Sequence, residues 1–418
     1  MLLNFLGGAR EVGRSAVLLQ DGGKNIMLDH GMKLGVKQEY PLPSARVDAV
    51  VLSHAHLDHS GSVPVIYNNE LVPTFGTAPT LKLSELLLDD TLEIARKEHL
   101  QPRFHKRQIS SFMNRYISLD YNSGSEFGSF NIEMHDAGHV SGSAITLIER
   151  TKAKDNRRVV YTGDFKMEEQ YLHRGAEVVK SDVLITESTY ATREHPDRTK
   201  LIKDFVENVK STLDNGGTAL VPVFAVGRSQ EILSILHRHR LTPVTYVDGM
   251  ARAATSIILK HPDFIRHDGV LSKAVEECMM IKDKRHRKDV LKEPSIILTT
   301  AGMLNGGPVL SYITKLNKSS KILITGYQVA GTNGRTLLDK GVVIIDEKAV
   351  KINTPTFYYD LSAHAGKDDL YKYVKQSAPR IVICMHGDEQ NTTDFAENLK
   401  LEGFEAYSPK IGEVIKLE

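Results

Sequence analysis

Short runs rich in β-branched residues recur along the whole chain, and each ends in a polar or glycine-containing turn. Their length and composition predict β-strands. Between several of them, apolar residues at three- and four-residue spacing predict helices over 79–98 and 227–240. Strands that alternate with helices predict an α/β protein. The predicted strands are KNIMLD (24–29), DAVVLS (48–53), RRVVYTGD (157–164), DVLITE (182–187), TALVPVF (218–224), SIILTT (295–300), KILITG (321–326) and PRIVICMH (379–386).

The composition is that of an ordinary globular protein, with 418 residues, enough for two cores of normal domain size. Only Cys278 and Cys384 are present, far apart in the sequence, which excludes a disulfide framework. The N-terminal residues lack a basic signal-peptide region, and no apolar stretch reaches the roughly 18 residues of a membrane helix. We therefore expect a cytoplasmic protein with no membrane partner.

Charge alone does not indicate a nucleic-acid partner, because the net charge is +1. Two local basic stretches, 96–107 and 282–292, are more typical of solvated helix faces than of a binding surface.

Potential ligands gather where the predicted strands end. Loops at the carboxyl ends of strands are where a rigid sheet can hold convergent polar groups, so we expect these side chains to meet at one edge of a sheet. The residues at or just beyond strand ends are Asp29, His54, Asp164, Glu187 and His386, and His139 follows a further strand predicted over 130–136.

The stretch LSHAHLDHSG (52–61) has the residue types of a metal site. His54 and His56 are two apart on an extended turn and can face one ion, whereas Asp58 and His59 can face a second ion nearby. Zinc takes imidazole and carboxylate ligands when cysteine is absent, and a catalytic zinc keeps one position for water. The alternative is a histidine-rich surface turn.

Two ions need more ligands than this stretch provides. The natural candidates are His139 in DAGHVSGSA, Asp164 in YTGDF and His386 in CMHGDEQ. A carboxylate such as Asp164 can bridge two ions where a histidine cannot. Each residue alone is more often an ordinary polar group, but together they complete a binuclear site.

The chain resembles the β-CASP ribonucleases of the metallo-β-lactamase superfamily. It is most similar to the endonuclease subunit of the cleavage and polyadenylation specificity factor and its archaeal relatives, and more distantly to ribonuclease J. The motifs that carry the resemblance are LGGAREVGRSAVLL, NIMLDHG, LSHAHLDHSG, DAGHVSGSA, YTGDF, LITESTYATREH, VPVFAVGRSQEIL, TAGMLNGGP, GYQVAGT, LSAHAG and CMHGDEQN, in this order.

The resemblance implies a metallo-β-lactamase αββα sandwich with an inserted α/β β-CASP domain. The sandwich would be built from 1–191 and from the returning segment 359–418, with the β-CASP domain at 192–358. Two zinc ions are implied. His54, His56 and His139 would hold one ion, Asp58, His59 and His386 the other, and Asp164 would bridge them.

The resemblance also implies the chemistry. Two zinc ions would activate a hydroxide that attacks the phosphodiester of single-stranded RNA, and His364, positioned by Glu187, would protonate the leaving oxygen. Asp29 would orient a histidine ligand. The residues expected to serve catalysis are His364, Glu187, Asp58 and Asp29, and the segment expected to contact the scissile phosphate is Ser362, Ala363, His364, Ala365 and Gly366.

Several alternatives stay open. An endonuclease is favoured over a 5′→3′ exoribonuclease of the ribonuclease J type, and a DNA nuclease, an inactive scaffold subunit or a small-molecule hydrolase is disfavoured because every ligand position and the SAHAG motif are present. Arg228 and Arg335 are further candidates for phosphate contacts. A homodimer or a larger RNA-processing complex is plausible.

Overall fold

The computed structural model describes residues 1–33, 38–44, 46–68, 71–151, 157–266, 269–329 and 331–417. The chain divides into two compact units. Unit 1 comprises Met1–Glu169, His173–Glu194 and His364–Glu418, and unit 2 comprises Gln170–Leu172 and His195–Ala363. The domain boundaries expected at 191/192 and 358/359 stay a prediction. No helix among the described ranges is long and apolar enough to cross a membrane.

Unit 1 is built on two seven-stranded sheets, each with an antiparallel and a parallel half. In spatial order, the first sheet contains β22 (Val414–Lys416), β1 (Leu2–Gly7), β2 (Ala16–Asp21), β3 (Lys24–Leu28), β4 (Ala49–Val51), β5 (Thr74–Gly76) and β6 (Tyr116–Ser118). The second contains β21 (Glu405–Tyr407), β20 (Ile381–Met385), β11 (Val183–Glu187), β10 (Arg158–Tyr161), β9 (Ala144–Arg150), β8 (Phe130–Asp136) and β7 (Ser123–Phe127).

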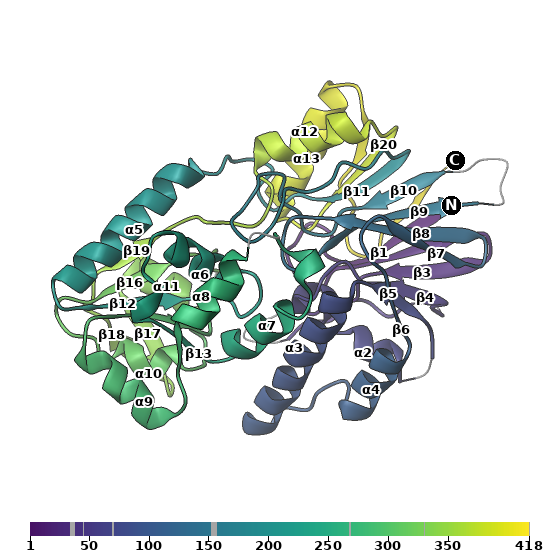
Figure 1. The fold of residues 1–418 in the computed structure, drawn as a ribbon. Helices are drawn as coiled ribbons and strands as arrows, with labels where there is room; N and C mark the ends of the chain where they lie inside the picture. Colours follow the sequence, from purple (N-terminus) through teal and green to yellow (C-terminus); the bar gives the residue numbers. More distant parts are fainter. Residues whose placement is uncertain are drawn as a thin grey trace. The chain divides into compact units, whose positions relative to one another are not determined.

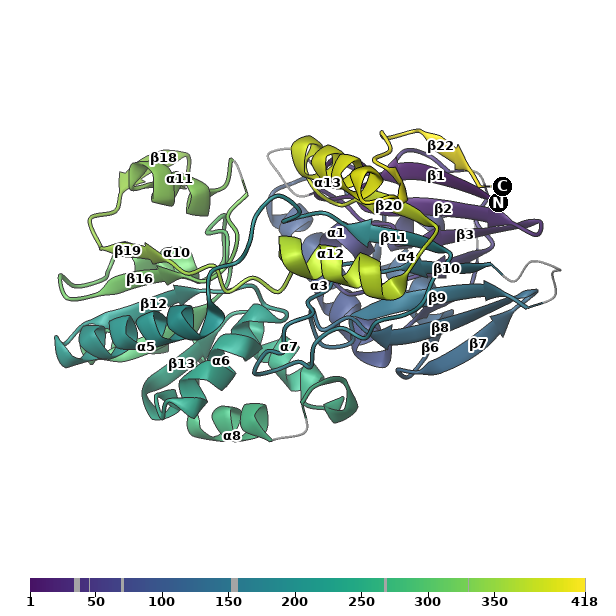
Figure 2. The same cartoon turned by 90° about the horizontal axis from the view of Figure 1, so that it is seen from above.

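The two sheets face each other and bury a shared core, because their central strands are apolar on both faces. In β2, Val17 and Leu19 join the core between the sheets, whereas Leu18 packs in a separate cluster with helix residues such as Phe112. Helices cover the outer face of each sheet, which gives the αββα order (Figures 1 and 2). The helices of unit 1 are α1 (Leu57–Ser60), α2 (Val63–Ile66), α3 (Ala78–Lys97), α4 (Lys106–Asn114), α12 (Lys367–Ser377) and α13 (Glu389–Leu401).

Unit 2 is built on a six-stranded parallel sheet. Its central strands are buried on both faces, as in other helix-covered parallel sheets. In spatial order the sheet contains β14 (Met279–Met280), β13 (Thr245–Asp248), β15 (Ser295–Thr299), β12 (Thr218–Pro222), β16 (Lys321–Ile324) and β19 (Thr356–Tyr358).

The remaining elements of unit 2 are its helices and a hairpin. The helices are α5 (Arg198–Asp214), α6 (Arg228–Arg238), α7 (Ala251–Ile258), α8 (Val270–Glu277), α9 (Lys284–Asp289), α10 (Val309–Ile313) and α11 (Asn333–Lys340), with short 3-10 turns at Thr242–Val244, Pro262–Phe264 and Val290–Lys292. The two-stranded hairpin consists of β17 (Val342–Ile345) and β18 (Lys348–Lys351).

The structure confirms all eight strands predicted from the β-branched runs and both predicted helices. Most of the predicted strands end one to three residues early in the structure, because the chain turns into the following loop before the apolar or polar run is complete. One expectation is wrong. The strand ends that carry the candidate ligands belong to two sheets rather than one, with β3 and β4 in the first sheet and β8, β10, β11 and β20 in the second.

Candidate metal centre

Asp29 lies at the end of β3 and is completely buried. Its carboxylate accepts hydrogen bonds from the backbone N–H and the hydroxyl of Ser53, both at 2.7 Å, and from the Tyr161 hydroxyl at 2.7 Å. It also lies 2.6 Å from Nδ1 of His59. Since these donors surround one buried carboxylate, Asp29 fixes the orientation of the His59 ring and leaves its Nε2 to face the site.

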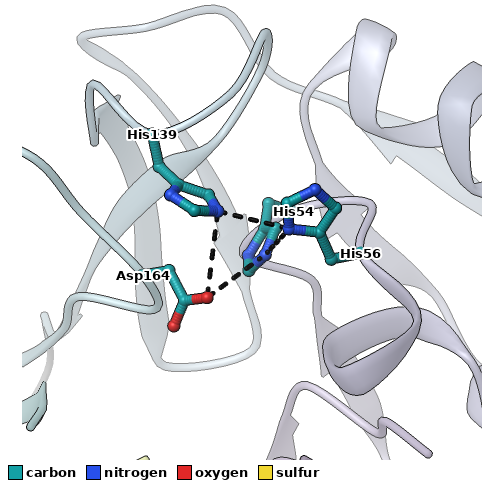
Figure 3. Close-up of side chains that lie close together, drawn as sticks. All are labelled: His54, His56, His139 and Asp164. Atoms are coloured by element: carbon teal, nitrogen blue, oxygen red, sulfur yellow. Dashed lines mark hydrogen bonds and ion pairs between the residues drawn. The ribbon is translucent and has the colours of Figure 1, made fainter. Parts of the chain in front are cut away.

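The first group of potential ligands joins both sheets of unit 1 (Figure 3). His54 and His56 come from the loop after β4, His139 from the turn after β8, and Asp164 from the loop after β10. One ligand atom from each of the four lies within 4.8 Å of the others. His56 Nδ1 is 3.2 Å from Nε2 of both other histidines, and Asp164 Oδ2 is 3.7 Å from His54 Nε2.

A second group uses the other half of the HAHLDH stretch. Asp58 and His59 lie in the short helix α1, His386 directly follows β20, and Asp164 again takes part. His386 Nε2 is 3.4 Å from Asp58 Oδ2, and His386 Nδ1 is 3.0 Å from Asp164 Oδ1. His59 Nε2 is 3.4 Å from Asp164 Oδ2. Asp164 is therefore the carboxylate that the two groups share.

A third group places His364 beside the same carboxylate. His364 Nδ1 is 3.0 Å from Oε2 of the buried Glu187 and 3.9 Å from Asp164 Oδ2. Glu187 is itself held by the backbone N–H of Phe165 at 2.9 Å. Although burial lowers it, the Glu187 and Asp164 carboxylates raise the pKa of His364 overall.

The donor atoms fit a divalent cation. Among the described residues, His59 Nε2, His386 Nε2 and Asp164 Oδ1 are buried without a hydrogen bond of good geometry. Burying such polar atoms without a partner costs free energy, unless a bound ion supplies the missing contact. Burial and the neighbouring His59 hold the pKa of His54 well below its usual range, so this ring is neutral, as a metal ligand must be.

The charged groups around Asp164 also favour a bound cation. Despite burial, His386 and His59 hold the pKa of Asp164 well below its usual range. Although burial of the His386 ring lowers its pKa, Asp164 in turn raises the pKa of His386 to about 10. The pocket therefore stabilises positive charge, and the nitrogen and oxygen donors without cysteine are those that zinc accepts.

Close backbone packing holds the second group in place. A Cβ on Gly31 would lie 1.6 Å from the carbonyl oxygen of Asp58. The same carbonyl accepts a hydrogen bond from the backbone N–H of Ser15 at 2.8 Å. Only glycine fits at position 31, because Asp58 lies in α1 and its carbonyl cannot move away without displacing that helix.

The residues expected to contact the scissile phosphate lie along one segment, whereas the further candidates Arg228 and Arg335 lie in α6 and α11 of unit 2. Ser362 and Ala363 end unit 2, whereas His364, Ala365 and Gly366 begin the last part of unit 1 and lead into α12. Glu194 accepts a hydrogen bond from the backbone N–H of Asp368, in the first turn of α12, at 2.8 Å. Ser53, Tyr161 and Glu194 were not identified from the sequence. Nothing in their local pattern separates them from ordinary loop and strand residues.

Comparisons with known proteins agree with this geometry. The family description "Beta-Casp domain" matches residues 229–337, "Zn-dependent metallo-hydrolase RNA specificity domain" matches 349–409, and "Anti-Pycsar protein Apyc1" matches 7–212. A solved structure, a protein of unknown function from Enterococcus faecalis V583, covers 100% of this chain and 99% of its own at a TM-score of 0.63. Its sequence identity of 16% supports the fold alone.

Full-length relatives are found among archaeal proteins. "Probable RNase MJ4" of Methanocaldococcus jannaschii is 38% identical over 100% of both chains, and "RNase aCSPSF2" of Saccharolobus solfataricus is 33% identical over 99% of this chain and 85% of its own. "Transcription termination factor FttA" of M. jannaschii is 32% identical over 95% and 68%. The chain therefore belongs to the β-CASP family of metal-dependent ribonucleases within the metallo-β-lactamase superfamily.

Proposed function

We propose that this chain hydrolyses phosphodiester bonds within single-stranded RNA, with two zinc ions and a histidine acid. The observation that carries the proposal is the sharing of Asp164. This one carboxylate belongs to two groups of four potential metal ligands and also to the group that contains Glu187 and His364. Metal ligands and a proton donor are thus held at one point, as hydrolysis of a phosphodiester requires.

Each ligand would have a defined place. His54, His56 and His139 would hold one ion, Asp58, His59 and His386 the other, and Asp164 would contribute to both. When bound, zinc supplies Lewis-acid chemistry, which makes water a nucleophile near neutral pH and offsets charge on a phosphate. Asp29 keeps the His59 ring in position through the 2.6 Å contact at its Nδ1.

His364 would give a proton to the leaving oxygen. Its Nδ1 faces Glu187, so Nε2 is the ring nitrogen that would deliver the proton. The Glu187 carboxylate favours the protonated ring, because it lies 3.0 Å away and is completely enclosed by protein. A positioned acid of this kind contributes roughly 10²–10⁴-fold to a rate.

Ser362, Ala363, Ala365 and Gly366 would contact the phosphate on either side of His364. Gly366 is the N-terminal cap of α12 and has no side chain to fill the space in front of the helix. Glu194 accepts a hydrogen bond from the backbone N–H of Asp368, one of the N–H groups at the start of this helix that have no partner within the helix.

Cleavage within the strand is the favoured mode, and 5′→3′ exonucleolytic cleavage is the alternative. The relatives named as ribonucleases and as transcription termination factors support RNA as the substrate, and nascent transcripts are one source of it. A homodimer or a larger RNA-processing complex would fit this role.

The test uses one RNA labelled at either end, with a 5′ triphosphate or monophosphate, and a matched single-stranded DNA. Zinc-loaded protein should produce defined internal RNA fragments from both 5′ forms and leave the DNA intact. Mononucleotides released only from the monophosphate RNA would establish the exonuclease instead. No cleavage of RNA with two ions bound would contradict the proposal.

Metal binding is tested separately by elemental analysis. Wild-type protein should contain two zinc ions per chain, and His386→Ala should contain one. Two ions in His386→Ala would show that His386 is not a ligand.

A further inference from the structure

The exposed aromatic side chains of the described residues all lie at one edge of unit 2. The chain has 15 tyrosines and 13 phenylalanines, and nearly all of them are buried or only slightly exposed. The exceptions are Tyr327, Phe357 and Tyr358, which are 49%, 37% and 38% exposed. Because large exposed aromatic rings are rare outside binding surfaces, their grouping calls for a ligand.

Phe357 and Tyr358 lie on β19, the edge strand of the parallel sheet, next to β16 (Figures 1 and 2). Successive side chains of a strand point to opposite faces, so the two rings flank the edge on both sides. On the Phe357 face, Lys321 Nζ lies 5.4 Å from the ring. Asn208 and Ser211 accept hydrogen bonds from this ammonium and hold it there without neutralising its charge.

The Tyr358 face also combines rings with a cation. Tyr327 follows the end of β16 by three residues, and Ile324 at that end pairs with Tyr358 on β19. The pKa of Arg335 is raised mainly by its hydrogen bonds to Asp339 and further by the hydroxyls of Tyr327 and Tyr358. Arg335 and Asp339 form an ion pair at 2.7 Å, with exposed fractions of 50% and 44%. Such a pair is weak in water, so a phosphate can replace Asp339.

We infer that this edge, formed by Lys321, Tyr327, Arg335, Phe357 and Tyr358, binds single-stranded RNA by stacking bases on the rings and pairing phosphates with the two cations. Aromatic rings interleaved with cations are how proteins hold single strands without sequence preference. The segment that carries Tyr358 runs directly into Ser362–Gly366, six residues before His364. The inference rests on the proposed function, because it takes RNA as the substrate.

A protein partner fits this edge less well. The strand β19 has only three residues, so an added strand would gain few backbone hydrogen bonds. The cations beside the rings match the charge of RNA, whereas pairing with a second copy of this chain would bring like charges together.

The test measures how tightly the full-length chain binds a fluorescein-labelled 12-nucleotide oligouridylate. Binding is monitored by fluorescence anisotropy, in a buffer whose chelator prevents cleavage. Tyr327→Leu and Tyr358→Leu should each raise Kd roughly 5- to 100-fold, because each removes one base stack. Tyr358→Phe keeps the ring and should bind within about twofold of wild type. Leu401→Ala changes another exposed apolar residue, 86% exposed on α13, and should have no effect.

The cation has its own readout. Lys321→Gln should make the dependence of log Kd on log salt shallower by about 0.7, the contribution of one phosphate contact on a single strand. With zinc-loaded protein and a long RNA, the tyrosine variants should raise KM and leave kcat unchanged, because the rings hold the substrate and take no part in the reaction.

Unchanged Kd in both leucine variants would overturn the inference even if the wild-type chain cleaves RNA. The inference would also be overturned if the wild-type chain is a dimer and Tyr358→Leu makes it a monomer without altering RNA binding. That result would identify the edge as an interface between copies of the chain. Weaker RNA binding by the leucine variants of a chain that does not cleave RNA would support the inference and contradict the proposed function.

Discussion

Replacing Tyr161 by phenylalanine tests whether the buried Asp29 carboxylate organises the metal site. The change deletes one hydroxyl that donates to Asp29 at 2.7 Å, with Tyr161 only 2% exposed. A hydrogen bond to a charged group contributes about 1.5–3 kcal/mol, against about 0.5–1.5 kcal/mol for a neutral pair. Asp29 keeps its contacts with Ser53 and His59, so we expect the fold to survive with about 2 kcal/mol less stability.

The matched control is Tyr67→Phe. Its hydroxyl is also buried but bonds only neutral partners, the carbonyl of Val72 and the hydroxyl of Thr74. Chemical denaturation of the metal-free chain should show a larger loss for Tyr161→Phe than for Tyr67→Phe.

Zinc affinity gives the second readout for this pair. Competition with a chromophoric chelator should show about tenfold weaker zinc binding in Tyr161→Phe alone, because partners behind a ligand set its orientation. Equal stability losses in the two variants, together with unchanged zinc affinity, would refute the role of Asp29 as the organiser of His59.

Two further substitutions probe the surroundings of the site. Gly31→Ala places a Cβ 1.6 Å from the Asp58 carbonyl, so we expect a loss of at least about 3 kcal/mol and of one zinc ion, measured by thermal unfolding and elemental analysis. An unperturbed Gly31→Ala protein would show that this backbone contact is not rigid. Burial, aided by the nearby Glu177, raises the pKa of Asp136 from 3.8 to about 7. The folded chain therefore binds this proton more tightly than the unfolded chain, and the associated stability is present below about pH 4 and lost as pH rises to about 7. Asp136→Asn should flatten this decline and, since the residue is only half-buried, gain on the order of 2 kcal/mol over wild type at pH 8. Parallel denaturation curves of the two proteins at every pH would contradict the assignment.

The strands and the first half of the site follow from local sequence. Runs such as DVLITE and PRIVICMH are apolar on both faces, and only buried strands accommodate that composition. The crowding of His54, His56, Asp58 and His59 is likewise visible without a structure, because all four belong to one loop and its short helix.

Long-range partners could not be predicted in this way. The pairing of strands into two sheets depends on which faces bury each other, and a strand's own residues do not specify its neighbour. Tyr161 reaches Asp29 across 132 positions of sequence, and Glu194 caps a helix 174 positions away. The aromatic residues proposed to bind RNA could not be predicted from the sequence either. Exposure distinguishes Tyr327 and Tyr358 from the buried Tyr359, whereas their sequence context does not.

Zinc content and RNA cleavage, measured together in His364→Ala, separate the metal ligands from the proton donor. We propose that His364, held by Glu187 at 3.0 Å, is the proton donor beside the metal ligands and binds no ion itself. His364→Ala should therefore keep two zinc ions per chain by elemental analysis while cleavage of single-stranded RNA falls roughly 10²–10⁴-fold. Loss of zinc together with activity, or wild-type cleavage with both ions bound, would contradict it.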